Sequence, residues 1–107
     1  MAEKNLEIAT LLDCYKELLT EKQKFLLECY YFEDLSLTEI ADNEGITPQG
    51  ARDIIKRAAD KLLNFEKQLK FAQYIENTSL LAEKIISAAQ KIENSEEIIK
   101  LAEQLII

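Results

Sequence analysis

The side chains of this chain best suited to chemistry are polar and basic, and they gather between positions 47 and 61. They recur at roughly helical spacing, so several are expected near one face of a single helix, namely Gln49, Arg52, Lys56 and Lys61. Glutamine and arginine can make paired hydrogen bonds to base edges, and lysine can contact phosphate. A nucleic-acid contact surface is therefore predicted, with the candidate residues Thr47, Gln49, Arg52, Asp53, Lys56, Arg57 and Lys61.

A solvated helix face is the alternative interpretation of the same charges. Asp53 and Arg57 are four residues apart, as are Lys56 and Asp60, so both pairs are spaced for ion pairs within one helix. Such pairs contribute only about 0.2–0.5 kcal/mol and need no ligand. Residues 48–70 nevertheless carry a net charge of +3, whereas the rest of the chain carries −10 of the total of −7. Residues 48–70 are thus a basic segment of an otherwise acidic protein.

The elements expected to position these residues are two helices joined by a tight turn, at about residues 36–63. Ser36 and Glu39 have the spacing of a capping box, which would begin the first helix. Gly45 can adopt the positive φ that ends it. Thr47 can cap a second helix in which Pro48 takes the first position, where a missing N–H has no cost. This is the pattern of a helix-turn-helix, whose second helix normally enters a DNA groove.

Composition predicts an all-α fold, a bundle of five or six helices that contains this motif. The 107 residues include only two glycines and one proline, and helix-forming residues dominate. The second helix of the motif is expected to continue to residue 70, and further helices are expected over residues 6–19, 21–32, 79–91 and 95–107. Phe25 and Phe32 are expected in the apolar body of the helix over residues 21–32.

The chain is predicted to divide into a helical domain over residues 1–70 and a C-terminal helical hairpin over residues 71–107, with a soft boundary at residues 71–77. The hairpin residues expected to face inward are Leu81, Ile85, Ala88, Ala89, Ile92, Ile98, Leu101, Ala102, Leu105 and Ile106. These stripes can pack on the chain's own domain or on a second subunit. The second arrangement is favoured, because the first domain already has a core, and the hairpin is then a dimerisation arm of a homodimer.

No catalytic residue, metal ligand or cofactor is predicted. The chain has no histidine, and it has no glycine-rich phosphate loop or recognisable nucleophile motif. Cys14 and Cys29 lie on apolar helical faces and are not spaced as a metal pair, so both are expected as reduced thiols of a cytoplasmic protein. No stretch approaches ~18 consecutive apolar residues, so no membrane insertion is expected. The acidic residues in the first apolar stretch also differ from a signal peptide.

The tract LTEKQKFLLECYYFEDLSLTEIADNEGITPQGARDIIKRAADKL resembles the last promoter-binding domain of bacterial sigma factors, a winged-helix-like fold without the wing. The tracts YYFEDLSLTEIADNEGITPQGARDIIKR and LLNFEKQL, together with the length, are more similar still to the YlxM-like family of small bacterial helix-turn-helix proteins. This resemblance implies a helical fold without established catalytic residues. It also implies a regulatory role linked to the signal recognition particle, beside whose GTPase genes the family is often encoded.

The sigma-factor resemblance implies which residues lie nearest the bases. Sigma factors place long polar or charged side chains at the positions equivalent to Pro48, Gln49, Arg52 and Asp53. Gln49 and Arg52 keep that character here, whereas Pro48 is not polar and Asp53 carries a negative charge. The expected function is a non-enzymatic regulatory or accessory protein that binds DNA or structured RNA. The alternative is a protein-interaction module, whose acidic body binds a basic partner such as a signal recognition particle GTPase.

Overall fold

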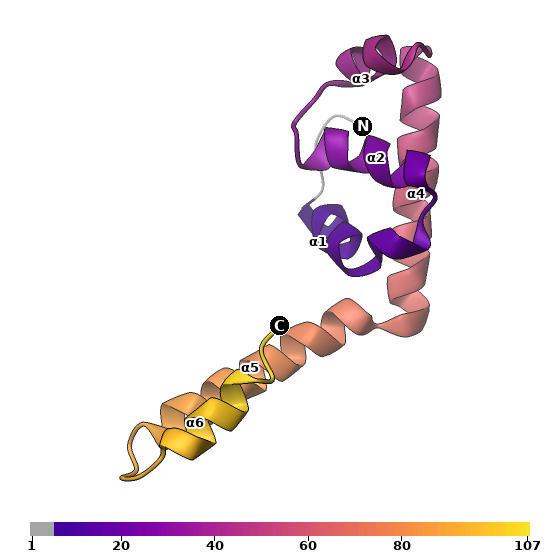
Figure 1. Cartoon of the computed structure of the whole chain (residues 1–107). Helices are drawn as coiled ribbons and strands as arrows, with labels where there is room; N and C mark the ends of the chain where they lie inside the picture. The colour runs from indigo at the N-terminus through magenta and orange to yellow at the C-terminus, as the bar shows by residue number, and fades with distance from the viewer. Residues whose placement is uncertain (1–5) are drawn as a thin grey trace. The chain divides into compact units, whose positions relative to one another are not determined.

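The computed structural model describes residues 6–107, and every regular element in that range is a helix (Figure 1). The elements in chain order are α1 (Leu6–Tyr15), a short 3₁₀ turn η1 (Lys16–Leu18), α2 (Glu21–Tyr31), α3 (Leu37–Glu44), α4 (Pro48–Leu69), α5 (Phe71–Ala89) and α6 (Glu96–Glu103). The predicted all-α helix-turn-helix fold is therefore confirmed. The helices form two compact units, which divide between Leu69 and Lys70.

Helix α4 is the spine of the first unit, and α1, α2 and α3 each pack against it (Figure 1). All four helices contribute to one core, whose largest fully buried side chains are Leu12, Leu26, Leu27, Ile40, Ile55 and Leu62. Burying such a side chain contributes roughly 1.5–3 kcal/mol. The shared core therefore holds three short helices on the spine, although helices of this length are marginal in isolation.

The helix ends in the first unit follow the local signals of the sequence. The hydroxyls of Thr20 and Ser36 each accept the N–H three residues on at 3.1 Å, and the side chain at that position accepts the cap's own N–H in return. Gly45 has a φ of 68°, and the N–H of Ile46 donates to the carbonyl of Ala41 at 3.1 Å. The capping box of Ser36 and the glycine turn are as predicted, and Thr20 with Gln23 forms a second capping box.

Two predicted helix boundaries are wrong. Helix α1 ends at Tyr15, and the 3₁₀ turn continues through Leu18. The break expected within residues 71–77 lies instead at Lys70, which has a φ of 53°, so α5 begins at Phe71 and not near residue 79. A residue in the left-handed region ends a helix, and glycine usually takes this role. Lysine is a good helix former, so its residue type does not signal such a break.

Helices α5 and α6 pack on each other in the second unit and enclose only small side chains. The buried residues of this unit are Ala82, Ala89, Ser95 and Ala102. Most of the hairpin stripe expected to face inward is instead exposed, namely Leu81, Ile85, Ala88, Ile92, Ile98, Leu101, Leu105 and Ile106. A pair of helices has one mutual interface, which is narrower than the apolar stripe of either helix, so the rest of each stripe is left open in the single chain. Packing of these stripes on a second subunit stays a prediction.

Candidate nucleic-acid interface

The close approach of α3 and α4 sets the orientation of the candidate face. Ala41 of α3 and Ala51 of α4 are both fully buried, and Ile46 is half-buried in the turn between the helices. Small residues at a helix crossing allow the two backbones to come close. The side of α4 that carries Ala51 is therefore committed to the core, and its opposite side faces solvent.

The start of α4 is fixed by Thr47. Its Oγ1 accepts the N–H of Gly50 at 2.9 Å, and Pro48 is the first residue of the helix. A Cβ on Gly50 would lie 3.1 Å from the same Oγ1, which is closer than most such contacts. The absence of a side chain at Gly50 thus leaves room for the cap of the helix.

The outward side of α4 carries two internal side-chain pairs. The Nε2 of Gln49 donates to Oδ1 of Asp53 at 3.0 Å, and the Nζ of Lys56 lies 3.3 Å from Oδ2 of Asp60. The predicted Lys56–Asp60 pair is thus confirmed, whereas the predicted pairing of Asp53 with Arg57 is wrong. Two carboxylates lie on the surface that was expected to meet phosphate.

The four residues expected near one face, Gln49, Arg52, Lys56 and Lys61, do not all share it. Arg52 and Lys61 are nine residues apart, about two and a half helical turns, so they lie on opposite flanks of α4. The Nζ of Lys61 donates to Oε1 of Gln23 on α2 at 3.2 Å. Across residues 6–107, the structure gives the exposed side chains of Arg52 and Arg57 no hydrogen bond or ion pair. The contact roles of these residues remain a prediction.

Two contacts that position α4 have no signal in the local sequence pattern. Oε1 of Gln23 accepts from Lys61 and also from the N–H of Thr20, each at 3.2 Å. The hydroxyl of Tyr15 donates to Oε1 of Glu66 at 2.6 Å. Lys61 and Gln23 are 38 residues apart, and Tyr15 and Glu66 are 51 residues apart, so no helical spacing rule pairs them. They tie α4 to α2 and to α1.

The two cysteines lie in the first unit as free, half-buried thiols. Burial raises the pKa of both thiols, and the nearby carboxylate of Glu66 raises the pKa of Cys14 further. A raised pKa keeps a thiol in its neutral, less reactive form. In residues 6–107 no three His, Cys, Asp or Glu side chains are grouped to hold a metal ion. No helix in this range is long and apolar enough to span a bilayer.

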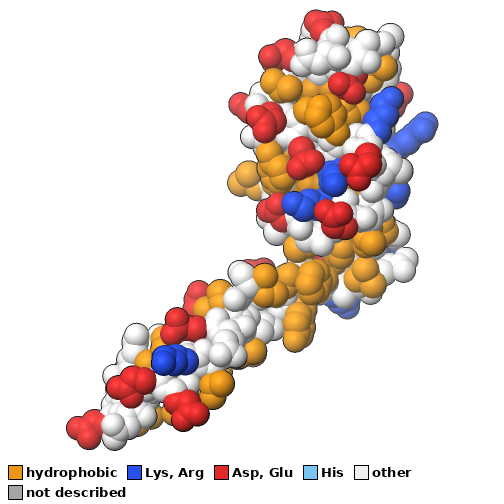
Figure 2. Space-filling model, viewed as in Figure 1, with side chains coloured by type: hydrophobic (Ala, Val, Ile, Leu, Met, Phe, Trp, Pro, Cys, Tyr) orange, Lys and Arg blue, Asp and Glu red, His pale blue; other side chains and the backbone are white. Residues whose placement is uncertain are grey.

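Positive charge in the first unit gathers along α4. Figure 2 shows Lys and Arg side chains projecting from the edge of this unit that α4 forms in Figure 1, while Asp and Glu side chains are scattered over the rest of the visible face among hydrophobic ones. The five basic residues of α4 are Arg52, Lys56, Arg57, Lys61 and Lys67. The basic residues expected from the sequence are therefore spread around the solvent side of α4, together with the acidic side chains of Asp53 and Asp60.

Comparison with known proteins identifies the family. The sequence profile of the UPF0122 family, described as "Putative helix-turn-helix protein, YlxM / p13 like", matches residues 2–102. A UPF0122 protein of Clostridium novyi (strain NT) is 41% identical over 87 residues, 78% of this chain and 76% of the relative. One from Halalkalibacterium halodurans is 36% identical over 105 residues, 98% of this chain and 96% of the relative. The chain therefore belongs to the UPF0122 family of YlxM/p13-like helix-turn-helix proteins.

Proposed function

We propose that this protein is a non-enzymatic nucleic-acid-binding protein with a regulatory or accessory role, and that it docks α4 on duplex DNA or structured RNA. The observation that carries the proposal is the pair of exposed guanidinium groups of Arg52 and Arg57, which make no contact within residues 6–107. An arginine without an internal partner is available for a phosphate or a guanine edge. Membership of a helix-turn-helix family supports the same function.

The kind of contact proposed for each residue depends on where the residue lies along α4. Gln49 and Arg52 lie in the first two turns, which contact base edges in helix-turn-helix proteins. Lys56 and Arg57 lie farther along the helix and suit contacts to the phosphate backbone, which fix position and carry no sequence information. Lys61 first has to leave its 3.2 Å hydrogen bond to α2, so it is the weakest of the proposed contacts.

The proposed setting is the signal recognition particle pathway in the cytoplasm, and it is supported by the family resemblance alone. The RNA of that particle is a structured RNA of the proposed ligand class. It is therefore the first RNA to compare with duplex DNA.

The experiment is a titration of the full chain with fluorescently labelled duplex DNA and with the particle RNA at several salt concentrations. Removing Arg52 and Lys56 as Arg52→Gln with Lys56→Gln is expected to weaken binding to the true ligand. Since Lys56 is the proposed phosphate contact of this pair and each such contact to duplex contributes roughly 0.9, the slope of log K against log salt is expected to become shallower by about 1.

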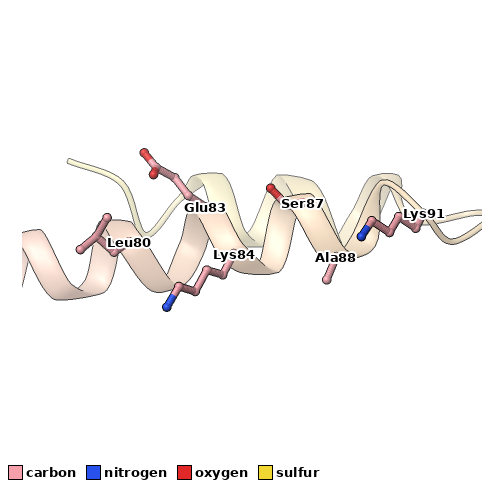
Figure 3. Close-up of a pocket in the computed structure, with 6 residues that line it drawn as sticks. All are labelled: Leu80, Glu83, Lys84, Ser87, Ala88 and Lys91. Atoms are coloured by element: carbon pink, nitrogen blue, oxygen red, sulfur yellow. The ribbon is translucent and has the colours of Figure 1, made fainter.

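The matched control is Lys84→Gln with Lys91→Gln, which removes the same charge from the second unit. Lys84 and Lys91 line an open groove of that unit together with Leu80, Glu83, Ser87 and Ala88 (Figure 3). This control is expected to leave the slope close to that of the unmodified protein. An equal loss of affinity in both double variants, or no binding of either ligand at low salt, refutes docking through α4.

An exposed aromatic stripe on α2 favours protein interaction as the second candidate function. Phe25 and Phe32 are 51% and 45% exposed, in contrast to the apolar body expected for them. Phe25 lies in α2 and Phe32 caps its C-terminal end, two helical turns further on. Glu21 and Glu28 lie near them by helical spacing, and Glu21 is 3.6 Å from the Nζ of Lys24. Apolar side chains among carboxylates suit a basic, partly apolar partner surface, as proposed for a particle GTPase.

This second candidate is tested by binding to the purified particle GTPase after nuclease treatment. Binding that survives the nuclease and is lost in Phe25→Ser with Phe32→Ser, but kept in Arg52→Gln with Lys56→Gln, supports it. Absence of binding to the nuclease-treated GTPase refutes it.

A further inference from the structure

The hairpin formed by α5 and α6 exposes an apolar face that its own unit leaves open. Leu81, Ile85 and Leu101 are 59%, 42% and 57% exposed. A groove of about 260 Å³ in this face is lined by Ile85, Ile98, Leu101, Ala102 and Leu105. Because α5 supplies Ile85 and α6 supplies the residues around it, the groove follows the contact between the two helices.

The hairpin buries too little apolar surface to be complete by itself. The unit spans Lys70–Ile107, and its buried residues are three alanines and one serine. Each buried methyl or methylene group contributes about 0.8 kcal/mol, so an alanine contributes far less than the leucines left outside. Chains shorter than about 40 residues generally need a metal, a disulfide or another subunit to stay folded. The exposed face is therefore expected to pack against something.

We propose that a second copy of this chain covers this face, so that two hairpins close into one four-helix bundle. An apolar face without charge is complementary to itself across a two-fold axis, which is how most homodimers form. The side chains that line the groove are all Leu, Ile or Ala, so no charge on this face selects a charged partner. Helix α5 has 19 residues and is about 28 Å long, which suits a bundle of this kind.

The available area is sufficient for a stable interface. Seven large apolar side chains of the hairpin stripe are each roughly half exposed, namely Leu81, Ile85, Ile92, Ile98, Leu101, Leu105 and Ile106. Covering these side chains on two copies would bury on the order of 1,000 Å², the size at which specific interfaces begin.

The other groove of this unit differs in character and provides a matched control. It has a volume of about 470 Å³ and is lined by Leu80, Glu83, Lys84, Ser87, Ala88 and Lys91. Figure 3 shows charged and hydroxyl side chains along this part of α5. Leu80 is 49% exposed here, close to the 42% of Ile85 in the apolar groove. Leu80 and Ile85 thus lie on the same helix with similar exposure but line different grooves.

The test is the mass of the full chain in solution, measured by sedimentation velocity at micromolar concentration without nucleic acid. The unmodified protein is expected as a dimer. Ile85→Glu is expected as a monomer, because it buries a charge in the interface, and Leu80→Glu is expected to stay dimeric. A monomeric unmodified protein, or equal dissociation of the two glutamate variants, overturns the proposal.

A second variant keeps the test decisive if Ile85→Glu unfolds the hairpin. Ile85→Ala with Leu101→Ala preserves helix propensity and truncates two interface side chains on each copy. Its dimer is expected to dissociate with a Kd at least about 100-fold higher, as removal of central interface side chains generally gives. An unchanged Kd, with the helix content of the unmodified protein, overturns the proposal. Since no nucleic acid is present, this result is independent of the proposed binding through α4.

Discussion

At the scale of single residues, the outward side of α4 combines groups that attract and repel phosphate. Arg52 and Arg57 are uncommitted within residues 6–107, whereas the carboxylate of Asp53 holds the amide of Gln49 at 3.0 Å. An acidic side chain among proposed contacts lowers affinity for any nucleic acid, because it repels the backbone whatever the sequence. The surface is therefore expected to bind less tightly than its basic residues alone suggest.

Replacing Asp53 with asparagine is expected to raise affinity for duplex DNA on the order of fivefold at low salt. Two charges about 4 Å apart in water interact by roughly 1 kcal/mol, and the variant removes such a repulsion. The change also weakens the acceptor that now holds Gln49. Titration of labelled duplex measures the effect, with Asp42→Asn on exposed α3 as the control for net charge. Equal gains in both variants would mean that Asp53 does not face the ligand.

At the scale of elements, one backbone conformation determines how α3 meets α4. Gly45 has a φ of 68°, and a Cβ there would contact no atom within 4 Å. The requirement for glycine is therefore one of backbone conformation and not of space.

Gly45→Ala is expected to lower the free energy of unfolding by roughly 1–2 kcal/mol, the cost of a left-handed conformation for an L residue. Gly45→Asn is expected to lower it less, because asparagine adopts this conformation more readily. Urea denaturation followed by circular dichroism measures both variants. Equal destabilisation by alanine and asparagine would show that the turn is limited by something other than backbone conformation.

The sequence predicted those elements whose cause is local. Ser36 with Glu39, and Gly45, act within one helical turn of the atoms they bind, so residue type and spacing were sufficient. The break at Lys70 was missed because lysine favours a helix. The bond between Lys61 and Gln23 was missed because its partners are 38 residues apart. The apolar stripe around Ile85 was predicted, but periodicity shows only that a face is apolar and does not show how much of it α5 and α6 cover for each other.

At the scale of the whole molecule, the two units differ in how their stability arises. The first has a core of large aliphatic side chains, whereas the second encloses only alanines and a serine. The adjacent residues Leu62 and Leu63 allow the first core to be tested directly, because Leu62 is fully buried and Leu63 is 40% exposed.

Leu62→Ala is expected to lower the free energy of unfolding of the first unit by about 2–5 kcal/mol, since it removes buried methyl groups and leaves a cavity. Leu63→Ala, which makes the same chemical change one residue later, is expected to lower it much less. Chemical denaturation followed by circular dichroism separates the two. Similar losses of unfolding free energy in the two variants would contradict the burial pattern of α4.

The arrangement of the first unit also has a consequence for its synthesis. Helices α1, α2 and α3 all pack on α4, and α4 follows them in the chain. A ribosome therefore releases the three short helices before the helix that completes their core, and their apolar sides stay unburied until residues as far as Leu62 have emerged. Domains of nascent chains fold as units once their sequence is available. Until α4 has emerged, the apolar sides of α1, α2 and α3 thus lack the helix that buries them.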